Sequence, residues 1–374
     1  MCRWIVYSAD SAHALTLGDL LSRPKHCLIT QAYHAGSHPG FSTKNNAQLN
    51  ADGFGVVWYS PAGRPFAYKS IAPAWSDSNL AELCACITSH VIFGHVRAAS
   101  PGSVVSHENC HPFKHGRLAM MHNGHVENFP ALRRALLARL SEEAFHAIKG
   151  LTDSEHLFAL VLTLLRQPSR SEPFAPQELA DALVGAIRHV LELLRAAGVV
   201  GGFTSLNCAL TDGVTCVSTR FCDNWPAVPP PSLYFAFPTV AELAEEQRGG
   251  TGGATAGPGD GSGSAAGVAR GGGGGAAAVV MPPQQPPQQQ EQEQGQYSAD
   301  YTRRAERWAQ DEAYLASIAP TASERALLIA SEPCGPGLAW VGMPANSLLV
   351  YSAGSGQAPT LTRLEELLLL PLTH

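Results

Sequence analysis

The start of the chain places a cysteine where its own backbone amine could assist it. The sequence begins Met1-Cys2-Arg3, so removal of Met1 would leave Cys2 with both a thiol and a free α-amine. The pKa of a free α-amine is about 7.7–8.0, so part of the population is neutral near neutral pH. A neutral amine can accept the thiol proton, directly or through one water, while the sulfur attacks a carbonyl carbon. Cys2 is therefore a candidate nucleophile.

Three further polar signals follow predicted strands or begin a predicted helix. Arg97 and the pair Asn123-Gly124 each come directly after an apolar run, and Asp153 begins a helical segment. Each also has a purely structural interpretation. Arg97 could be a surface arginine, Asn123-Gly124 could form a hairpin turn, and Asp153 could cap the helix.

Together these residues supply the parts needed to split a γ-carboxamide. The side-chain amide of Asn123 and the backbone N–H of Gly124 could hold the oxyanion of a tetrahedral intermediate. Glycine permits the close backbone approach that such a site requires. The fork of Arg97 could clamp the α-carboxylate of a glutamine-like substrate, and Asp153 could hold its α-ammonium group. The pattern predicts amide hydrolysis through Cys2.

The elements that would position these residues are buried strands and amphipathic helices. Strands are predicted over residues 2–8, 53–59, 90–97, 117–122, 203–210, 214–221, 233–237, 326–330 and 347–351, and helices over 129–148, 152–165 and 176–197. Thr152 and Glu155 fit the capping-box pattern. Strands, then a helical block, then strands again predict two sheets with helices outside, which is an α+β sandwich.

Residues 249–296 differ from the rest of the chain in composition. They contain Gly, Ala and Ser runs followed by Pro and Gln repeats, with almost no large apolar side chain. Such a segment cannot bury enough apolar surface to offset its ordering entropy, so we expect a disordered and inert insertion in a surface loop. The predicted organisation is one domain built from residues 2–248 and 297–374.

Composition excludes several classes of partner. The net charge of −6 and the pI near 6.2 provide no basic surplus for nucleic acid. No apolar run has membrane-spanning length, and the start of the chain lacks the apolar core of a signal peptide. Nine cysteines without CxxC pairs are typical of a reducing compartment. We therefore expect a cytoplasmic protein.

Metal and cofactor sites are not predicted. Histidines are dense between His90 and His125, but no pair has the helical spacing with a carboxylate that a zinc hydrolase shows. The glycines at 271–275 are low complexity and no phosphate-binding glycine motif precedes a helix. Cys110, followed by His111, is an alternative nucleophile, although the favoured interpretation is a small buried residue in a loop.

Six segments in chain order resemble the motifs of class II glutamine amidotransferases. They are Met1-Cys2-Arg3, Asp52-Gly53-Phe54-Gly55, Gly94-His95-Val96-Arg97-Ala98, Asn109-Cys110-His111-Pro112-Phe113, His122-Asn123-Gly124 and Thr152-Asp153-Ser154-Glu155. That class belongs to the N-terminal nucleophile hydrolases, so the resemblance implies their four-layer αββα fold. Within the class, the chain is most similar to the stand-alone YafJ-like branch, which includes the fungal amidotransferase subunit of a glutathione-degrading complex. Shared segments include Ala72-Pro73-Ala74-Trp75-Ser76, Ser331-Glu332-Pro333 and Pro344-Ala345-Asn346.

The resemblance implies a role for each candidate residue. These roles are the nucleophile for Cys2, the oxyanion hole for Asn123 and Gly124, and substrate clamps for Arg97 and Asp153. It implies that His95 orients nearby groups, while a satisfied strand-end histidine stays an open alternative. The chain departs from the family at His125-Val126 and at Ala99-Ser100, which flank these residues and bear on substrate shape.

The predicted function is an amidohydrolase that attacks a γ-glutamyl amide through Cys2 and hydrolyses the resulting thioester without a cofactor. The substrate is glutamine or a γ-glutamyl peptide such as glutathione, and the branch resemblance favours glutathione degradation. The alternative is a non-catalytic or ammonia-donating subunit that requires a protein partner. An inactive relative would be expected to lose Cys2, Asn123 or Asp153, and all three are present.

Overall fold

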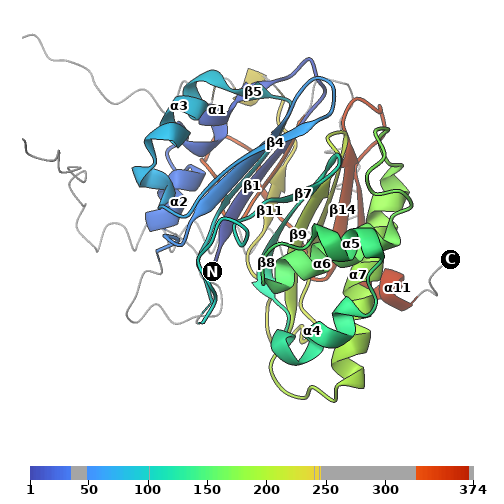
Figure 1. The fold of residues 1–374 in the computed structure, drawn as a ribbon. Coiled ribbons are helices and arrows are strands. Elements are labelled where there is room, and N and C mark those ends of the chain that lie inside the picture. Colours follow the sequence, from blue (N-terminus) through green and yellow to red (C-terminus); the bar gives the residue numbers. More distant parts are fainter. Residues whose placement is uncertain (35–48, 101, 240, 244, 246–325, 370–374) are drawn as a thin grey trace, which may run out of the picture.

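The computed structural model describes residues 1–34, 49–100, 102–239, 241–243, 245 and 326–369. The segment 249–296, for which we expect an insertion, lies outside these residues. The described strands form a seven-stranded sheet, a six-stranded sheet and a two-stranded ribbon (Figure 1). Within the described ranges, no helix combines the length and the apolar character needed to cross a bilayer.

The seven-stranded sheet contains the start of the chain at its centre. Its strands, in the order β13-β11-β12-β1-β6-β3-β4, are β13 (Val341–Gly342), β11 (Tyr234–Ala236), β12 (Leu327–Ala330), β1 (Arg3–Ser8), β6 (Val91–Val96), β3 (Phe54–Tyr59) and β4 (Pro65–Ser70). Strand β1 pairs antiparallel with β6 on one side and with β12 on the other. Its continuous apolar run suits a strand that is buried on both faces.

The six-stranded sheet carries the Asn123-Gly124 pair. Its order is β15 (Thr360–Arg363), β14 (Ser347–Ser352), β10 (Thr215–Arg220), β9 (Ser205–Thr211), β8 (Leu118–His125) and β7 (Phe113–His115). The small ribbon pairs β2 (Leu15–Thr16) with β5 (Thr88–Ser89). Strands β4 and β7 are therefore terminal strands of the two large sheets.

Helices cover the outer face of each large sheet (Figure 1). The seven-stranded sheet is covered by α1 (Leu17–Leu21), α2 (Leu28–Tyr33) and α3 (Ser78–Cys86), with the short 3-10 helix Ala74–Ser76 beside them. The six-stranded sheet is covered by α4 (Phe129–Leu137), α5 (Glu142–Ala147), α6 (Asp153–Leu164), α7 (Pro176–Ala196) and α11 (Leu364–Leu369). The α+β class predicted from the order of the elements is confirmed.

Side-chain alternation decides which residues lie between the two sheets. Trp4 from β1 packs with Ala119 and Met121 from β8 in an apolar cluster that both sheets share. Side chains two residues apart in a strand point to the same face. Cys2 therefore continues the inward face of β1, and Asn123 continues the inward face of β8. Candidate residues about 120 positions apart in the sequence are brought to one layer.

The predicted strands and helices are present, with two corrections. Residues 129–148 were predicted to form one helix, but α4 ends at Leu137 and α5 begins at Glu142. Ser141 separates them, because its hydroxyl accepts a hydrogen bond from the amide of Ala144 and starts a new helix. The leucine spacing continues across the break, so the pattern alone conceals it.

The second correction concerns Asn123-Gly124, whose predicted turn is wrong. Both residues lie inside β8, where they pair with Asn207 and Leu206 of β9. The ladder continues to His125. Pairing with a neighbouring strand therefore overrides the local turn preference of an Asn-Gly pair.

The beginning of β1 is fixed by residues from the far end of the chain. Arg3 Nε lies 2.7 Å from Glu332 Oε1, and both side chains are only 3% exposed. The other oxygen of Glu332 lies 2.8 Å from His26 Nε2. Ser331 exchanges two 3.0 Å hydrogen bonds with the backbone of Trp4. The Ser331-Glu332-Pro333 segment therefore anchors the residues next to Cys2.

We predict that Glu332→Ala lowers the free energy of unfolding by about 3–5 kcal/mol, because the substitution leaves the guanidinium of Arg3 buried beside no carboxylate. Glu192→Ala, which breaks a partly exposed ion pair with Arg139, is the control and should cost at most about 1 kcal/mol. Denaturant unfolding of the three proteins measures both values. Equal losses in the two variants would show that the Arg3–Glu332 pair does not hold β1.

Candidate active site

Cys2 is half-buried at the entrance of β1, beside the segment that follows β6. Its Sγ lies 3.4 Å from the amide nitrogen of Ala98 and 3.5 Å from the carbonyl oxygen of the same residue. Burial raises the pKa of the Cys2 thiol, and the Ala98 hydrogen bond and the positive charge of Arg97 only partly oppose this effect. The thiol therefore needs a nearby base to become a thiolate.

Asn123 reaches from the other sheet to the backbone of Cys2. Its Nδ2 donates a hydrogen bond of 2.9 Å to the carbonyl oxygen of Cys2. The same oxygen accepts a 3.1 Å bond from Arg3 Nη1. Since Asn123 is only 3% exposed, its amide has a defined position in the layer between the sheets. The candidate nucleophile and the candidate oxyanion donor therefore lie next to each other.

Gly124 has a backbone conformation and a neighbour that only glycine tolerates. Its φ is +145°, and a Cβ atom at this position would lie 1.9 Å from the carbonyl oxygen of Ser205. Any other residue would have to push β9 away from β8. The glycine thus allows the two strands to stay paired directly beside Asn123.

Arg97 follows β6 and is buried. One of its two terminal guanidinium nitrogens forms hydrogen bonds with described residues and the other does not. Nη2 donates to the hydroxyl of Ser103 at 2.8 Å and to the carbonyl of Val104 at 3.3 Å. Nη1 is buried and has no hydrogen-bond partner among the described residues. A buried donor without a partner is costly, so this nitrogen is suited to receive an anionic group.

Asp153 connects α6 to the chain that leaves β8. Oδ1 accepts a 2.8 Å bond from the amide of Ser154, and Oδ2 accepts a 2.8 Å bond from the amide of Val126. The cap of α6 is Thr152, whose hydroxyl accepts from the amide of Glu155. The structural interpretation of Asp153 as the helix cap is therefore wrong, and its carboxylate is held close to Asn123-Gly124 by backbone donors.

Only half of the predicted capping box forms. The hydroxyl of Thr152 accepts the expected hydrogen bond from the amide of Glu155. The carboxylate of Glu155, however, accepts hydrogen bonds from the amides of Lys149 at 3.0 Å and Gly150 at 2.6 Å. Glu155 is buried, and burial raises its pKa. This carboxylate stabilises the turn before α6 instead of the first turn of the helix.

His95 lies in a buried pair with His111. The ring centroids are 4.3 Å apart with planes inclined by 27°. Neither ring forms a well-aligned hydrogen bond with the described residues. Burial lowers the pKa of both imidazoles, that of His95 to about 3, so both rings are neutral at pH 7. The described contacts of His95 are its stacking on His111 and the nearby backbone of His122, which are structural contacts of a buried histidine near the end of its strand.

His122 is a residue whose contacts the sequence patterns did not reveal. Its Nδ1 lies 2.8 Å from the hydroxyl of Ser154, and its Nε2 lies 3.1 Å from the carbonyl of Ser205. It therefore joins β8 to α6 and to β9, next to Asn123 in the chain. His122 precedes Asn123 in β8, so its side chain points to the opposite face of the sheet, which the helices cover. This alternation is the sequence signal that could have indicated its contacts.

Cys110, the alternative nucleophile, has a structural environment. It is fully buried, and its Sγ lies 3.3 Å from the carbonyl of Ser106 and 3.6 Å from that of Ser70. Burial raises the pKa of its thiol.

In the part of the chain that the structure describes, no group of three His, Cys, Asp or Glu side chains is arranged to hold a metal ion.

Comparison with known families agrees with this arrangement. The model of the family described as glutamine amidotransferases class-II matches residues 31–222, slightly more than half of the 374 residues. The chain belongs to the class II glutamine amidotransferases. The match includes Arg97, Asn123-Gly124 and Asp153, and it begins after Cys2.

Individual class II relatives cover parts of the chain. A probable glutamine amidotransferase of Saccharomyces cerevisiae, DUG3, is 34% identical over 59% of this chain and 64% of its own length. A γ-glutamyl-hercynylcysteine sulfoxide hydrolase of Mycolicibacterium smegmatis is 26% identical over 34% of this chain and 52% of its own length. The chain thus spans less than two thirds of either curated relative.

A solved structure has a fold similar to that of this class II amidotransferase. The structure of a glutamine aminotransferase class-II domain protein from Silicibacter pomeroyi aligns with a TM-score of 0.51 at 20% identity. The alignment covers 97% of this chain and 99% of that chain. At this level of identity the likeness concerns the fold alone.

The lowered pKa of His95 predicts acid sensitivity. The unfolded chain protonates this imidazole below about pH 6.5, whereas the folded protein does so only near pH 3, so the free energy of unfolding falls as the pH decreases through this window. Between pH 7 and pH 5 we predict that His95→Gln loses about 2 kcal/mol less than the unsubstituted protein. Denaturant unfolding at the two pH values measures the difference.

The exposed His146 supplies the control for that experiment. His146→Gln should keep the acid sensitivity of the unsubstituted protein. If His95→Gln and the unsubstituted protein lose the same stability between pH 7 and pH 5, the imidazole of His95 is not held neutral by burial.

Proposed function

We propose that this protein cleaves a γ-glutamyl amide, with Cys2 as the nucleophile once Met1 has been removed. The observation that carries the proposal is the 2.9 Å hydrogen bond from Asn123 to the carbonyl of Cys2. It brings a thiol at the start of one sheet and an amide donor on the other sheet into one buried layer. Family membership supports the same chemistry.

The proposed reaction has two halves. The α-amine of Cys2 takes the thiol proton as sulfur attacks the γ-carbonyl carbon, and Asn123 Nδ2 with the Gly124 N–H stabilises the oxyanion. The amine of the substrate takes a proton and leaves, which gives a γ-glutamyl thioester on Cys2. Water then attacks the thioester, and glutamate and the free thiol are released. A local base is essential here, because burial raises the pKa of the Cys2 thiol.

Arg97 and Asp153 are the proposed clamps for the amino-acid head of the substrate. Arg97 Nη1 is a buried donor without a partner among the described residues, which suits an α-carboxylate. The carboxylate of Asp153 is oriented by the amides of Val126 and Ser154 and has lone pairs left for an α-ammonium group. His95 is the proposed orienting residue, which acts by stacking on His111.

The proposed fold is the four-layer αββα sandwich of the N-terminal nucleophile hydrolases. Helices on the outer faces of both sheets support this proposal (Figure 1). We further propose a single domain from residues 2–248 and 297–374, because β12, which follows the long insertion segment, lies between β1 and β11. The shared sheet is the support for this organisation.

The proposed substrate is a γ-glutamyl compound, with glutathione and free glutamine as the two options. One relative is named a γ-glutamyl-hercynylcysteine sulfoxide hydrolase, which supports γ-glutamyl substrates other than glutamine. Transfer of ammonia to a partner is the alternative, and it predicts a preference for glutamine. Rates with glutamine, glutathione and other γ-glutamyl amides distinguish these options.

We predict that Cys2→Ala abolishes release of glutamate from every γ-glutamyl substrate while the protein stays folded, because the sulfur of Cys2 is the proposed acceptor of the γ-glutamyl group. Cys110→Ala is the matched control and should keep the activity, since its thiol is enclosed by the carbonyls of Ser70 and Ser106. Glutamate release and circular dichroism measure the two effects. Full activity of Cys2→Ala would end the proposal.

Substitution of the clamp should affect binding more than turnover. We predict that Arg97→Ala raises KM by about 10- to 100-fold, since a charged hydrogen bond to the substrate carboxylate contributes about 1.5–3 kcal/mol. Arg64→Ala, at an exposed arginine in the turn before β4, should leave KM unchanged. An Arg97→Ala protein with an unchanged KM would exclude the clamp role.

A further inference from the structure

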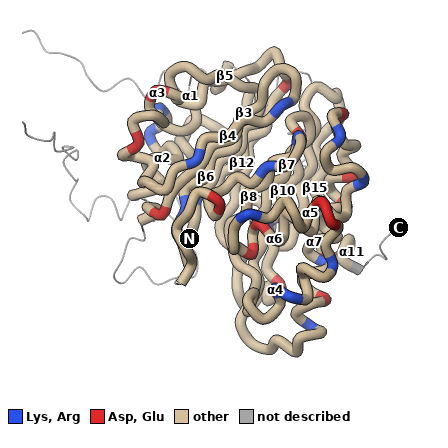
Figure 2. Tube along the Cα trace, viewed as in Figure 1, with Lys and Arg blue, Asp and Glu red and all other residues tan. Residues whose placement is uncertain are grey.

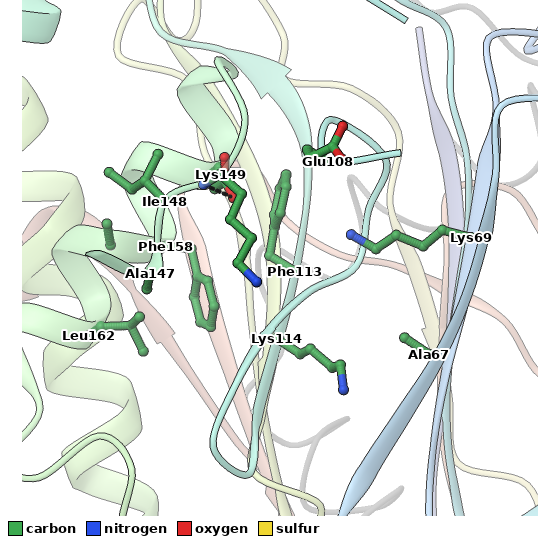
Figure 3. A pocket seen from close by; sticks show the side chains of 12 residues that line it. Ala67, Lys69, Glu108, Phe113, Lys114, Ala147, Ile148, Lys149, Phe158 and Leu162 are labelled. Atoms are coloured by element: carbon green, nitrogen blue, oxygen red, sulfur yellow. Dashed lines mark hydrogen bonds between the residues drawn. The ribbon is translucent and has the colours of Figure 1, made fainter. Parts of the chain in front are cut away.

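Three of the five lysines in the chain line one cavity. The lysines are Lys25, Lys44, Lys69, Lys114 and Lys149. Lys69 comes from β4, Lys114 from β7, and Lys149 from the turn between α5 and α6. The cavity has a volume of about 370 Å³ and lies where the terminal strands of the two large sheets meet the helices (Figure 3). Residues far apart in the sequence thus concentrate positive charge in one place.

The cavity also has apolar walls. Phe113 from β7, Phe158 and Leu162 from α6, and Ile148 from the preceding turn contribute its wall (Figure 3). None of the six residues proposed for amide cleavage lines this cavity. Its volume falls within the range of about 300–1,000 Å³ that is typical of small-molecule sites.

The lysines have no carboxylate partners of their own among the described residues. No ion pair in the described part of the chain includes Lys69, Lys114 or Lys149. Lys69 donates to the carbonyl of Cys110 and lies 5.1 Å from the ring centroid of Phe113. Burial lowers the pKa of its ammonium group to about 8, and a bound anion would offset that cost.

Two carboxylates also line the cavity and offset part of its positive charge, since Glu155 and Glu108 both attract the ammonium group of Lys69. Both oxygens of Glu155 accept backbone hydrogen bonds, from Lys149 and Gly150. Glu108 is exposed at the rim. Elsewhere, positive and negative residues are scattered along the trace (Figure 2). The cavity therefore has three lysines against two carboxylates, beside an aromatic and aliphatic wall.

We propose that this cavity binds a small organic anion with an apolar body. The anionic head would lie between the ammonium groups of Lys69, Lys114 and Lys149, and an aryl or alkyl body would pack against Phe113 and Phe158. Charge and hydrocarbon are both required, because exposed lysines alone hold an anion weakly and an apolar wall alone does not select its charge. This site is independent of the proposed amide cleavage.

The test uses 2-naphthoate as the probe and isothermal titration calorimetry at low salt. We expect 2-naphthoate to bind the unsubstituted protein, and its uncharged counterpart 2-naphthamide to bind about tenfold more weakly or not at all. The double variant Lys114→Ala/Lys149→Ala should weaken naphthoate binding by about five- to tenfold, since both side chains are exposed and each contributes a modest charge interaction.

Two control variants locate the probe. Lys25→Ala removes an exposed lysine that does not line the cavity and should leave the dissociation constant unchanged. Arg97→Ala should also bind naphthoate normally, which separates this site from the candidate clamp. The proposal is overturned by absence of naphthoate binding, by equal affinity for naphthoate and naphthamide, or by an unchanged dissociation constant in the lysine double variant.

Discussion

The hydrogen bond from Asn123 to the carbonyl of Cys2 is the contact on which the candidate site depends. The two large sheets also meet through apolar side chains such as Trp4 and Met121, which fix their spacing but carry little directional information. A second buried hydrogen bond between the sheets, from the hydroxyl of Tyr59 to the carbonyl of Thr211 at 3.4 Å, lies away from Cys2. A buried amide donor adds direction, because its geometry is restricted and an unmade bond is costly. This bond therefore fixes the position of Asn123, on one sheet, relative to Cys2, on the other sheet.

That contact depends on the anchoring of β1. Arg3 donates to the carbonyl of Cys2 while its Nε is held by Glu332, so the first residues of β1 are bound from both sides. The anchoring residues follow the long segment that the structure does not describe. A buried ion pair is weak evidence for added stability, because desolvation of the two charges offsets their attraction. The Arg3–Glu332 pair matters here because it fixes the position of the first residues of β1.

Two glycines let backbone segments approach closely beside the candidate site. Gly124 lets β8 and β9 pair beside Asn123, since a Cβ atom would meet the carbonyl of Ser205. Gly55 has the corresponding role in β3, because a Cβ atom there would lie 2.2 Å from the carbonyl of His111. The stacked pair of His95 and His111 fills the space next to this approach, where two neutral rings pack as apolar groups.

The sequence predicted the main strands and long helices because continuous apolar runs and leucine spacing are strong signals. It missed the break at Ser141, since the leucines continue beyond it, and it placed Asn123-Gly124 in a turn because pairing with β9 is not visible locally. Motif order indicated the candidate site residues. The contact between Arg3 and Glu332, 329 positions apart, and the lysine cavity both depend on strand order, which no local pattern encodes.

Mass spectrometry of the protein quenched with acid during turnover of glutamine or glutathione tests the central claim most directly. The account predicts an N-terminal peptide that begins at Cys2, lacks Met1 and carries a γ-glutamyl group that hydroxylamine removes. An active protein that retains Met1, or that carries the γ-glutamyl group on another residue such as Cys110, would contradict the account.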